Sequence, residues 1–289
     1  MFVLKIIIKT ISKKTIKMNL VSTKWLSKNL GKVKIIDASW HLKKDRNALA
    51  EYKKKHIKNA IFLDLDKVSN QNLNLPHNHF LPKKEQWEQK LSEIGISNNS
   101  TVVIYDHSDL ISSCRIWFQF RYFGHNSDLV FVLNGGLKSW ILENRKVTDK
   151  KTKILASKYI AKENKNMIKN KSQIKKNIKT KTFKVLDARS KNRFLGLEPE
   201  PRPNVKSGHI KNSKSLPFNE LINKENNTFL DKKNLKKKFN LAGINGLNIV
   251  TTCGSSVSAA TLALAYSLIN SNYVPKIYIG SWSEYGKIR

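Results

Sequence analysis

The chain has 289 residues, enough for one large domain or for two ordinary domains that each bury a hydrophobic core. Its net charge is +33, but only eight of the 54 basic residues are arginines, and the lysines are spread along the whole sequence. No zinc-finger, helix-turn-helix or RNA-binding signature accompanies this charge, so we expect a lysine-coated surface and no nucleic-acid partner. Lysines also interrupt every apolar stretch, so none reaches the length of about 18 residues that is needed to span a bilayer. We therefore expect a soluble protein without a membrane partner.

Residues 1–17 are basic, and Lys5 divides their one apolar stretch. Because no small-residue cleavage site follows, this segment is a poor secretory signal, and we expect a disordered N-terminal extension. Cys114 and Cys253 are the only cysteines, which predicts no disulfide framework and favours a reducing compartment such as the cytoplasm. No metal site or cofactor is expected.

A long-period duplication organises the rest of the chain. In the first half VKIIDAS leads to HIKNAIFLDL, which begins at His56; in the second half FKVLDARS leads to HIKNSKSLPF, which begins at His209. Both copies continue with a short β-branched run, TVVIYD ending at Asp106 and LNIVTTC ending at Cys253. A helical segment, another short apolar run and a turn with glycine and tryptophan follow in each copy.

Short apolar runs bounded by polar turn residues are typical of buried parallel strands with helices on both sheet faces. The alternation of strands and helices predicts an α/β protein with two doubly wound parallel-sheet domains. We place the domains at 18–148 and 158–289, joined by a lysine-rich linker at 149–157. Asp106 stands where the second copy has Cys253, so the first domain is expected to be catalytically inactive.

The loop that begins at Cys253 is the candidate site. Ligands of open parallel sheets bind beyond the carboxyl ends of the strands, and the strand NIVTT runs directly into Cys-Gly-Ser-Ser-Val-Ser. A thiol in this position meets the positive end of a helix dipole and inward-turned backbone N–H groups, which lower its pKa and can hold a sulfur anion. A lone cysteine is also often a packing residue, so position alone leaves both interpretations open. The residues of the loop are Cys253, Gly254, Ser255, Ser256, Val257 and Ser258.

This loop resembles the active loop of tandem-rhodanese 3-mercaptopyruvate sulfurtransferases, whose pattern is Cys-Gly-Ser-Gly-Val-Thr/Ser-Ala. The resemblance covers nearly the whole chain from about Asn19, through HIKNAIFLDLD and HNHFLP in the first half and EPEPRP and GSWSEYG in the second. It implies two tandem rhodanese-like domains. It also implies a sulfurtransferase that moves sulfur from 3-mercaptopyruvate through a Cys253 persulfide to cyanide or to a thiol such as thioredoxin, with release of pyruvate.

The resemblance also implies a pair of arginines that hold the carboxylate and keto oxygen of the donor. They correspond to Arg193 and to Arg202 of EPEPR. Planar guanidinium groups bind a carboxylate through two hydrogen bonds, and their charge favours a nearby thiolate. Glu198 and Glu200 leave a second interpretation open, in which the arginines, chiefly Arg202, form surface ion pairs of little energetic value.

An aspartate, a histidine and the loop serine converge near the donor in the same family, and they correspond to Asp66, His79 and Ser255. Ser255 would hydrogen-bond the keto oxygen, while the His–Asp pair would polarise it or supply the proton that converts enolate into pyruvate. His77 is a neighbouring rival for the role of His79, and a plain surface loop is the alternative interpretation of His79. Cys114 lacks the loop sequence and is expected to be a packing residue.

Two positions depart from the family pattern: Ser256 replaces a glycine, and Ile279 replaces an aspartate. A positive φ angle at position 256 would strain the loop. A thiosulfate sulfurtransferase is the nearest alternative, but basic residues would be expected where Gly254 and Ser255 stand. A phosphatase requires an arginine where Ala259 stands and is set aside. A non-catalytic binding module on the same fold is the alternative of another class.

Overall fold

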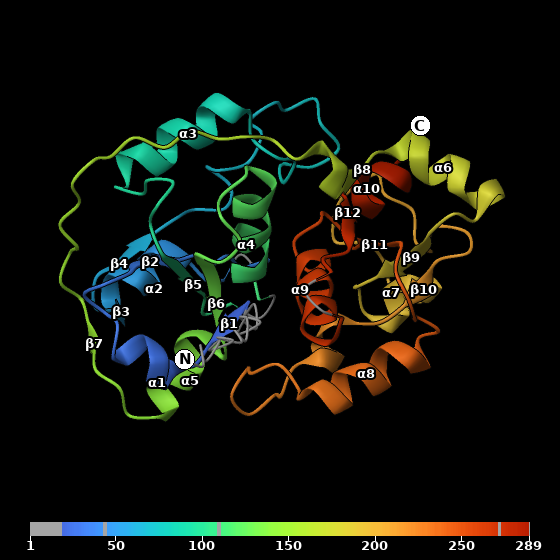
Figure 1. Cartoon of the computed structure of the whole chain (residues 1–289). Coiled ribbons are helices and arrows are strands. Elements are labelled where there is room, and N and C mark those ends of the chain that lie inside the picture. Colours follow the sequence, from blue (N-terminus) through green and yellow to red (C-terminus); the bar gives the residue numbers. More distant parts are fainter. Residues whose placement is uncertain (1–18, 43–44, 109–110, 271–272, 289) are drawn as a thin grey trace, which may run out of the picture.

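The computed structural model describes residues 19–42, 45–108, 111–270 and 273–288. It contains two five-stranded sheets, one in each half of the chain, and helices cover their faces (Figure 1). All strand pairs within these two sheets are parallel. The predicted α/β class with two doubly wound domains is therefore confirmed. The expected extension at 1–17 lies outside the described residues.

The first sheet has the strand order β1-β6-β5-β2-β4. A separate antiparallel pair, β3 with β7, lies at its side. The strands are β1 (Leu20–Val21), β2 (Lys34–Asp37), β3 (His56–Ile57), β4 (Ala60–Phe62), β5 (Val102–Tyr105), β6 (Val130–Leu133) and β7 (Val147–Thr148). The helices are α1 (Thr23–Ser27), α2 (Ala48–Lys54), α3 (Lys84–Glu93), α4 (Ser113–Tyr122) and α5 (Gly136–Leu142).

The second sheet has the order β10-β9-β11-β12-β8, which repeats the first when the strands are matched in chain order. Asp106 directly follows β5, and Cys253 directly follows the matching strand β11. The strands are β8 (Ile168–Lys169), β9 (Lys184–Asp187), β10 (Lys214–Ser215), β11 (Ile249–Thr252) and β12 (Lys276–Tyr278). The helices are α6 (Lys171–Thr180), α7 (Lys191–Leu195), α8 (Lys232–Leu241), α9 (Ala259–Ile269) and α10 (Ser281–Tyr285), with 3-10 turns η1 (Lys165–Met167) and η2 (Phe218–Leu221).

Helices α4 and α9 join the two domains. They contact each other at the centre of the molecule, where Figure 1 shows them side by side. Both are buried along almost their whole length, and one hydrophobic cluster contains residues from both domains. The sequence of α9, AATLALAYSLI, is apolar on all sides of the helix. A helix of this kind is stable only when neighbouring elements bury it on all sides. The domain interface is therefore packed like a core.

The segment between the domains lies against α3. Ser157 and Tyr159 donate backbone N–H groups to the carbonyl and hydroxyl of Ser92, at 2.9 and 3.0 Å. The N–H of Ala161 donates to Glu88 Oε1 at 2.7 Å. No helix or strand lies between residues 149 and 164. The domain boundaries at 148 and 158 stay predictions.

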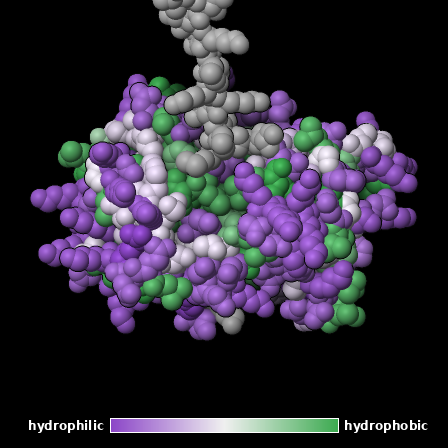
Figure 2. Space-filling model, turned by 60° about the horizontal axis from the view of Figure 1, so that its bottom comes forward, coloured by the Kyte–Doolittle hydropathy of each residue, from purple (hydrophilic) through white to green (hydrophobic). Residues whose placement is uncertain are grey.

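Hydrophilic side chains cover most of the face seen in Figure 2, with hydrophobic side chains scattered among them. This agrees with a lysine-coated surface. Among the described residues, no helix has the length and apolar character that crossing a membrane requires.

Candidate active site

Cys253 lies at the carboxyl end of β11, in the loop that leads into α9. Its N–H donates to Ser281 Oγ at 3.3 Å, and its carbonyl accepts the N–H of Trp282 at 2.9 Å. The carbonyl of Gly254 accepts both the N–H and the hydroxyl of Ser283, at 3.0 and 2.7 Å. The start of α10 therefore holds the first two residues of the loop. Cys253 is a free thiol and is only 3% exposed.

Ser256 has a φ angle of +63° and is buried. This left-handed conformation costs a residue with a side chain about 1 to 2 kcal/mol, whereas glycine adopts it freely. The strain that the sequence predicted for a positive φ at this position is thus present in the backbone. Val257 belongs to the hydrophobic core, and Ser258 is the N-cap of α9 without a side-chain cap. These two residues directly precede the first residue of α9, Ala259.

Arg193, on α7, and Arg202 lie next to the backbone of the loop. A Cβ atom added to Gly254 would be 3.1 Å from Arg193 Nη2 and 3.4 Å from Arg202 Nη1. Arg202 Nη2 also donates to Ser255 Oγ at 2.9 Å. A side chain at position 254 would therefore crowd the guanidinium of Arg193 and touch that of Arg202.

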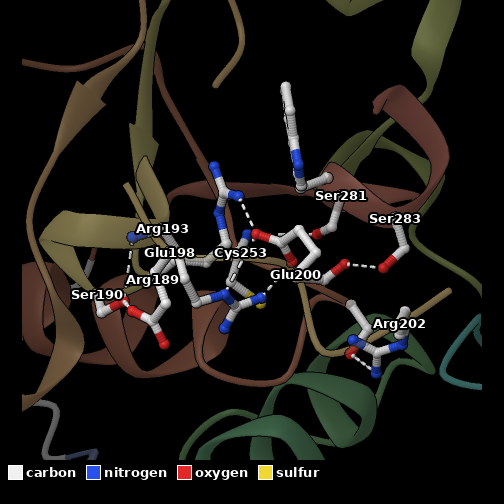
Figure 3. Close-up of polar contacts among 12 residues, drawn as sticks. Arg189, Ser190, Arg193, Glu198, Glu200, Arg202, Cys253, Ser281 and Ser283 are labelled. Carbon is white, nitrogen blue, oxygen red and sulfur yellow. Dashed lines mark hydrogen bonds and ion pairs between the residues drawn. The ribbon is translucent and has the colours of Figure 1, made fainter. Parts of the chain in front are cut away.

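Arg193 forms an ion pair with Glu200, and this pair lies below the surface of the protein. Arg193 Nη2 lies 2.5 Å from Glu200 Oε2, and both residues are drawn in Figure 3. The Glu200 side chain is only 1% exposed. The alternative interpretation, in which chiefly Arg202 forms a surface ion pair, does not describe this site, because Arg202 hydrogen-bonds Ser255. Glu198 accepts a hydrogen bond from Ser190. Since Glu200 binds both Nε and Nη2 of Arg193, it holds the guanidinium plane in one orientation.

Arg189 completes this ionic cluster and was missed in the sequence. Its guanidinium contacts Asp187 at 2.7 Å and Glu200 at 2.6 Å, and it lies 4.8 Å from the centre of the Trp282 ring. Asp187 therefore takes part in a structural ion pair. Arg189 thus anchors Glu200, which in turn orients Arg193.

The first domain contributes Asp66 and His79 to the same place. His79 Nδ1 lies 2.9 Å from Ser255 Oγ, and His79 Nε2 lies 3.0 Å from Asp66 Oδ1. Because a carboxylate accepts only, Nε2 carries the proton and Nδ1 accepts the Ser255 hydroxyl proton. Ser255 Oγ in turn accepts an N–H of Arg202. A continuous chain of hydrogen bonds therefore runs from Asp66 through His79 and Ser255 to Arg202.

The charges along this chain are set by burial and by hydrogen bonds. Burial lowers the pKa of His79, and the neighbouring Asp66 offsets only part of this effect. Burial raises the pKa of the Asp66 carboxyl, but hydrogen bonds from His79 and Trp40 outweigh it, so the net pKa is lowered. The favoured state is an Asp66 carboxylate next to a neutral His79, which is suited to accepting and returning a proton.

His77 supports His79. His77 Nε2 donates to the carbonyl of Ile279 across the domain interface at 3.1 Å, and Nδ1 accepts the N–H of His79 at 3.0 Å. Both histidines are buried, at 6% and 0% exposure, so the surface-loop alternative is wrong. Burial lowers the pKa of His77 to about 3, which keeps it neutral.

Arg115 also reaches the loop and was missed in the sequence. It lies on α4 of the first domain, and its guanidinium donates to Ser256 Oγ at 3.1 Å and to the carbonyl of His79 at 2.8 Å. The sequence signal that could have found it is an arginine within the mainly apolar and aromatic helix segment SCRIWFQFRY. In the structure the Arg115 side chain is fully buried.

The other candidate positions are far less reactive. Cys114 is fully buried, and burial raises the pKa of its thiol well above the usual range, as expected of a packing residue. In the first domain Asp106 accepts hydrogen bonds from the Ser113 hydroxyl at 2.5 Å and from the Ser108 N–H at 3.1 Å. No thiol stands at that position.

A cavity of about 850 Å³ lies elsewhere, between the start of the first sheet and the linker. Its lining includes Lys32, Lys34, Lys58 and Lys150 but none of the candidate residues. None of the loop residues that resemble the family's active loop lines this cavity, so the site around Cys253 is the better candidate.

The chain belongs to the rhodanese family, since the model of the rhodanese-like domain matches it twice, at residues 22–143 and 170–287. It is similar to thiosulfate/3-mercaptopyruvate sulfurtransferase 2 of Arabidopsis thaliana, with 38% identity over 291 residues, covering 92% of this chain and 83% of the relative. The mitochondrial thiosulfate/3-mercaptopyruvate sulfurtransferase 1 of the same plant is 36% identical over 290 residues, covering 92% and 75%.

Among solved structures, SseA from Escherichia coli, described as showing the fold and mechanism of 3-mercaptopyruvate sulfotransferases, is similar with a TM-score of 0.80 and 27% identity. That match covers 92% of this chain and 99% of SseA. The protein is therefore a sulfurtransferase of the 3-mercaptopyruvate/thiosulfate type.

We predict that His77→Asn makes stability less dependent on pH. Folded His77 stays neutral down to about pH 3, whereas the unfolded side chain binds a proton below 6.5, so wild-type stability falls as the pH drops through this window. One such group contributes about 1.4 kcal/mol per pH unit. Urea unfolding across the window should show a smaller slope for His77→Asn, whose amide oxygen can take the place of Nδ1 as the acceptor of the His79 N–H. Equal slopes in the two proteins would contradict the assignment.

Proposed function

We propose that the protein transfers sulfur from 3-mercaptopyruvate through a persulfide on Cys253. The observation that carries this proposal is the position of the Arg193 and Arg202 guanidinium groups beside the backbone of Gly254, the residue after Cys253, together with the hydrogen bond from Arg202 to Ser255. Two guanidinium groups and a hydroxyl beside a thiol suit a donor with a carboxylate and a keto oxygen close to its sulfur.

In the proposed first step, the Cys253 thiolate attacks the donor sulfur and the bond between that sulfur and carbon 3 breaks. The electron pair of the broken bond passes to carbon 3 as an enolate, whose oxygen is stabilised by Arg202 and Ser255. The proton of the donor thiol moves through Ser255 to His79 and returns to carbon 3, which gives pyruvate. Asp66 stabilises the transient imidazolium of His79.

In the second step, an acceptor thiolate attacks the outer sulfur of the persulfide, and Cys253 leaves as a thiolate. The acceptor becomes a persulfide, or thiocyanate when the acceptor is cyanide. A thiol acceptor such as thioredoxin fits this chemistry. Cys114 and Cys253 are both free thiols, which supports our placement of the protein in a reducing compartment such as the cytoplasm.

Thiosulfate is the alternative donor, and the relatives carry both donors in their names. The two arginines would also attract this dianion. Mercaptopyruvate is favoured because Gly254 and Ser255 follow the cysteine, where a dianion would be better held by cations, and because a proton-carrying chain is needed only for pyruvate release. A non-catalytic binding module has no need of this chain, which includes the fully buried His79.

The persulfide is tested by intact-mass analysis after mixing with 3-mercaptopyruvate. The wild type and Cys114→Ser should each gain the mass of one sulfur, and Cys253→Ser should gain none, because only Cys253 lies in the loop at the start of α9. Sulfur uptake by Cys253→Ser, or equal losses in both variants, would overturn the single-nucleophile mechanism.

The choice of donor is tested with Arg202→Ala. Loss of a charge-assisted hydrogen bond costs about 1.5 to 3 kcal/mol, so kcat/KM for mercaptopyruvate should fall roughly ten- to hundred-fold, and kcat/KM for thiosulfate should fall less. Arg145→Ala, which removes an ion pair with Glu143 in the first domain, is the control and should leave both values unchanged. If thiosulfate is the better donor for the wild type, the mercaptopyruvate assignment is wrong.

A further inference from the structure

The buried guanidinium of Arg115 has no carboxylate partner. The side chain is fully buried, and its Nε atom makes no hydrogen bond. Its other contacts are with neutral oxygens, the hydroxyl of Ser256 and the carbonyl of His79. No aspartate or glutamate in the described part of the chain forms an ion pair with it, in contrast to Arg189 and Arg193.

An unpaired charge inside a protein is strongly unfavourable unless an opposite charge compensates it. Burial lowers the pKa of Arg115 to about 10, and Cys253 is the one group whose charge acts in the opposite direction. Arg202 is also influenced by Cys253, but Glu200 and Asp66 compensate its charge as well. Cys253 is therefore the natural source of the missing negative charge near Arg115.

Ser256 connects Arg115 to the loop. Ser256 adopts a positive φ where the resembling family has glycine, so its side chain carries a conformational cost. In return its hydroxyl accepts a hydrogen bond from the guanidinium, which a glycine could not do. The departure from the family pattern thus gives the buried cation a fixed position beside the loop that contains Cys253.

We propose that Arg115 is a positioning residue and the internal counter-ion of the sulfur site: it is held by Ser256 and His79 and compensates the charge of the Cys253 thiolate and then of its persulfide. Arg193 and Arg202 serve the donor from the side of Gly254, whereas Arg115 comes from α4 of the other domain. The persulfide part of this inference rests on the proposed function.

The test is the pH titration of the Cys253 thiol, followed by the ultraviolet absorbance of the thiolate without any sulfur donor. All variants carry Cys114→Ser, so that one thiol remains. Arg115→Met should raise the midpoint by about one pH unit or more, because a cation close to a thiolate lowers its pKa by that order. Arg115→Lys, which keeps a charge, should recover part of the shift.

Arg121→Met is the matched control. Arg121 lies on the same helix, stacks on Trp117 and also has a buried Nε without a partner, but it has no contact with the loop. Its removal should perturb α4 to a similar degree and leave the Cys253 midpoint unchanged. Ser256→Ala keeps a side chain at the strained position while removing the acceptor, and it should raise the midpoint in the same direction as Arg115→Met.

An unchanged midpoint in folded Arg115→Met, or a shift of the same size in Arg121→Met, would overturn the inference. If Arg115→Met does not fold, an unchanged midpoint in Ser256→Ala would overturn it instead. The titration needs no sulfur transfer, so it is independent of the proposed function. A thiol that responds to Arg115 in a protein that takes up no sulfur would refute the persulfide and leave the thiolate counter-ion in place.

Discussion

The hydrogen bond between His79 of the first domain and Ser255 of the second connects the two domains at the site around Cys253. The residues that the two domains contribute there are different in kind. The second domain has the thiol and the arginines, and the first domain has the imidazole and its carboxylate partner, Asp66. Neither domain alone contains the whole set. The packing of α4 against α9 therefore matters for more than stability, because it brings His79 within 2.9 Å of Ser255.

Duplication explains why the first domain serves this purpose. Its sheet repeats the strand order of the second, but a carboxylate, Asp106, stands where Cys253 would be. A domain without a nucleophile can devote its loops and helices to the partner site. The buried residues His77, His79 and Arg115 are all examples, since each contacts a residue of the second domain.

The sequence predicted the fold well because the repeat and the short buried strands are local patterns. It also named most residues that meet around Cys253, since their motifs lie in short segments that resemble a known family. Arg189 and Arg115 were missed, because each acts through partners distant in the chain. The sequence left open an ion pair on either arginine, chiefly Arg202, and the structure has it on Arg193, because the direction of a side chain depends on tertiary packing that spacing does not reveal.

His79 and Ser255 are expected to act as one unit across the domain interface. A double-mutant cycle with His79→Ala and Ser255→Ala, measured as kcat/KM for 3-mercaptopyruvate, tests it most directly. If the two side chains work through a shared hydrogen bond, the double variant should be little worse than the more impaired single variant. Losses that multiply would show two independent contributions and would contradict this account.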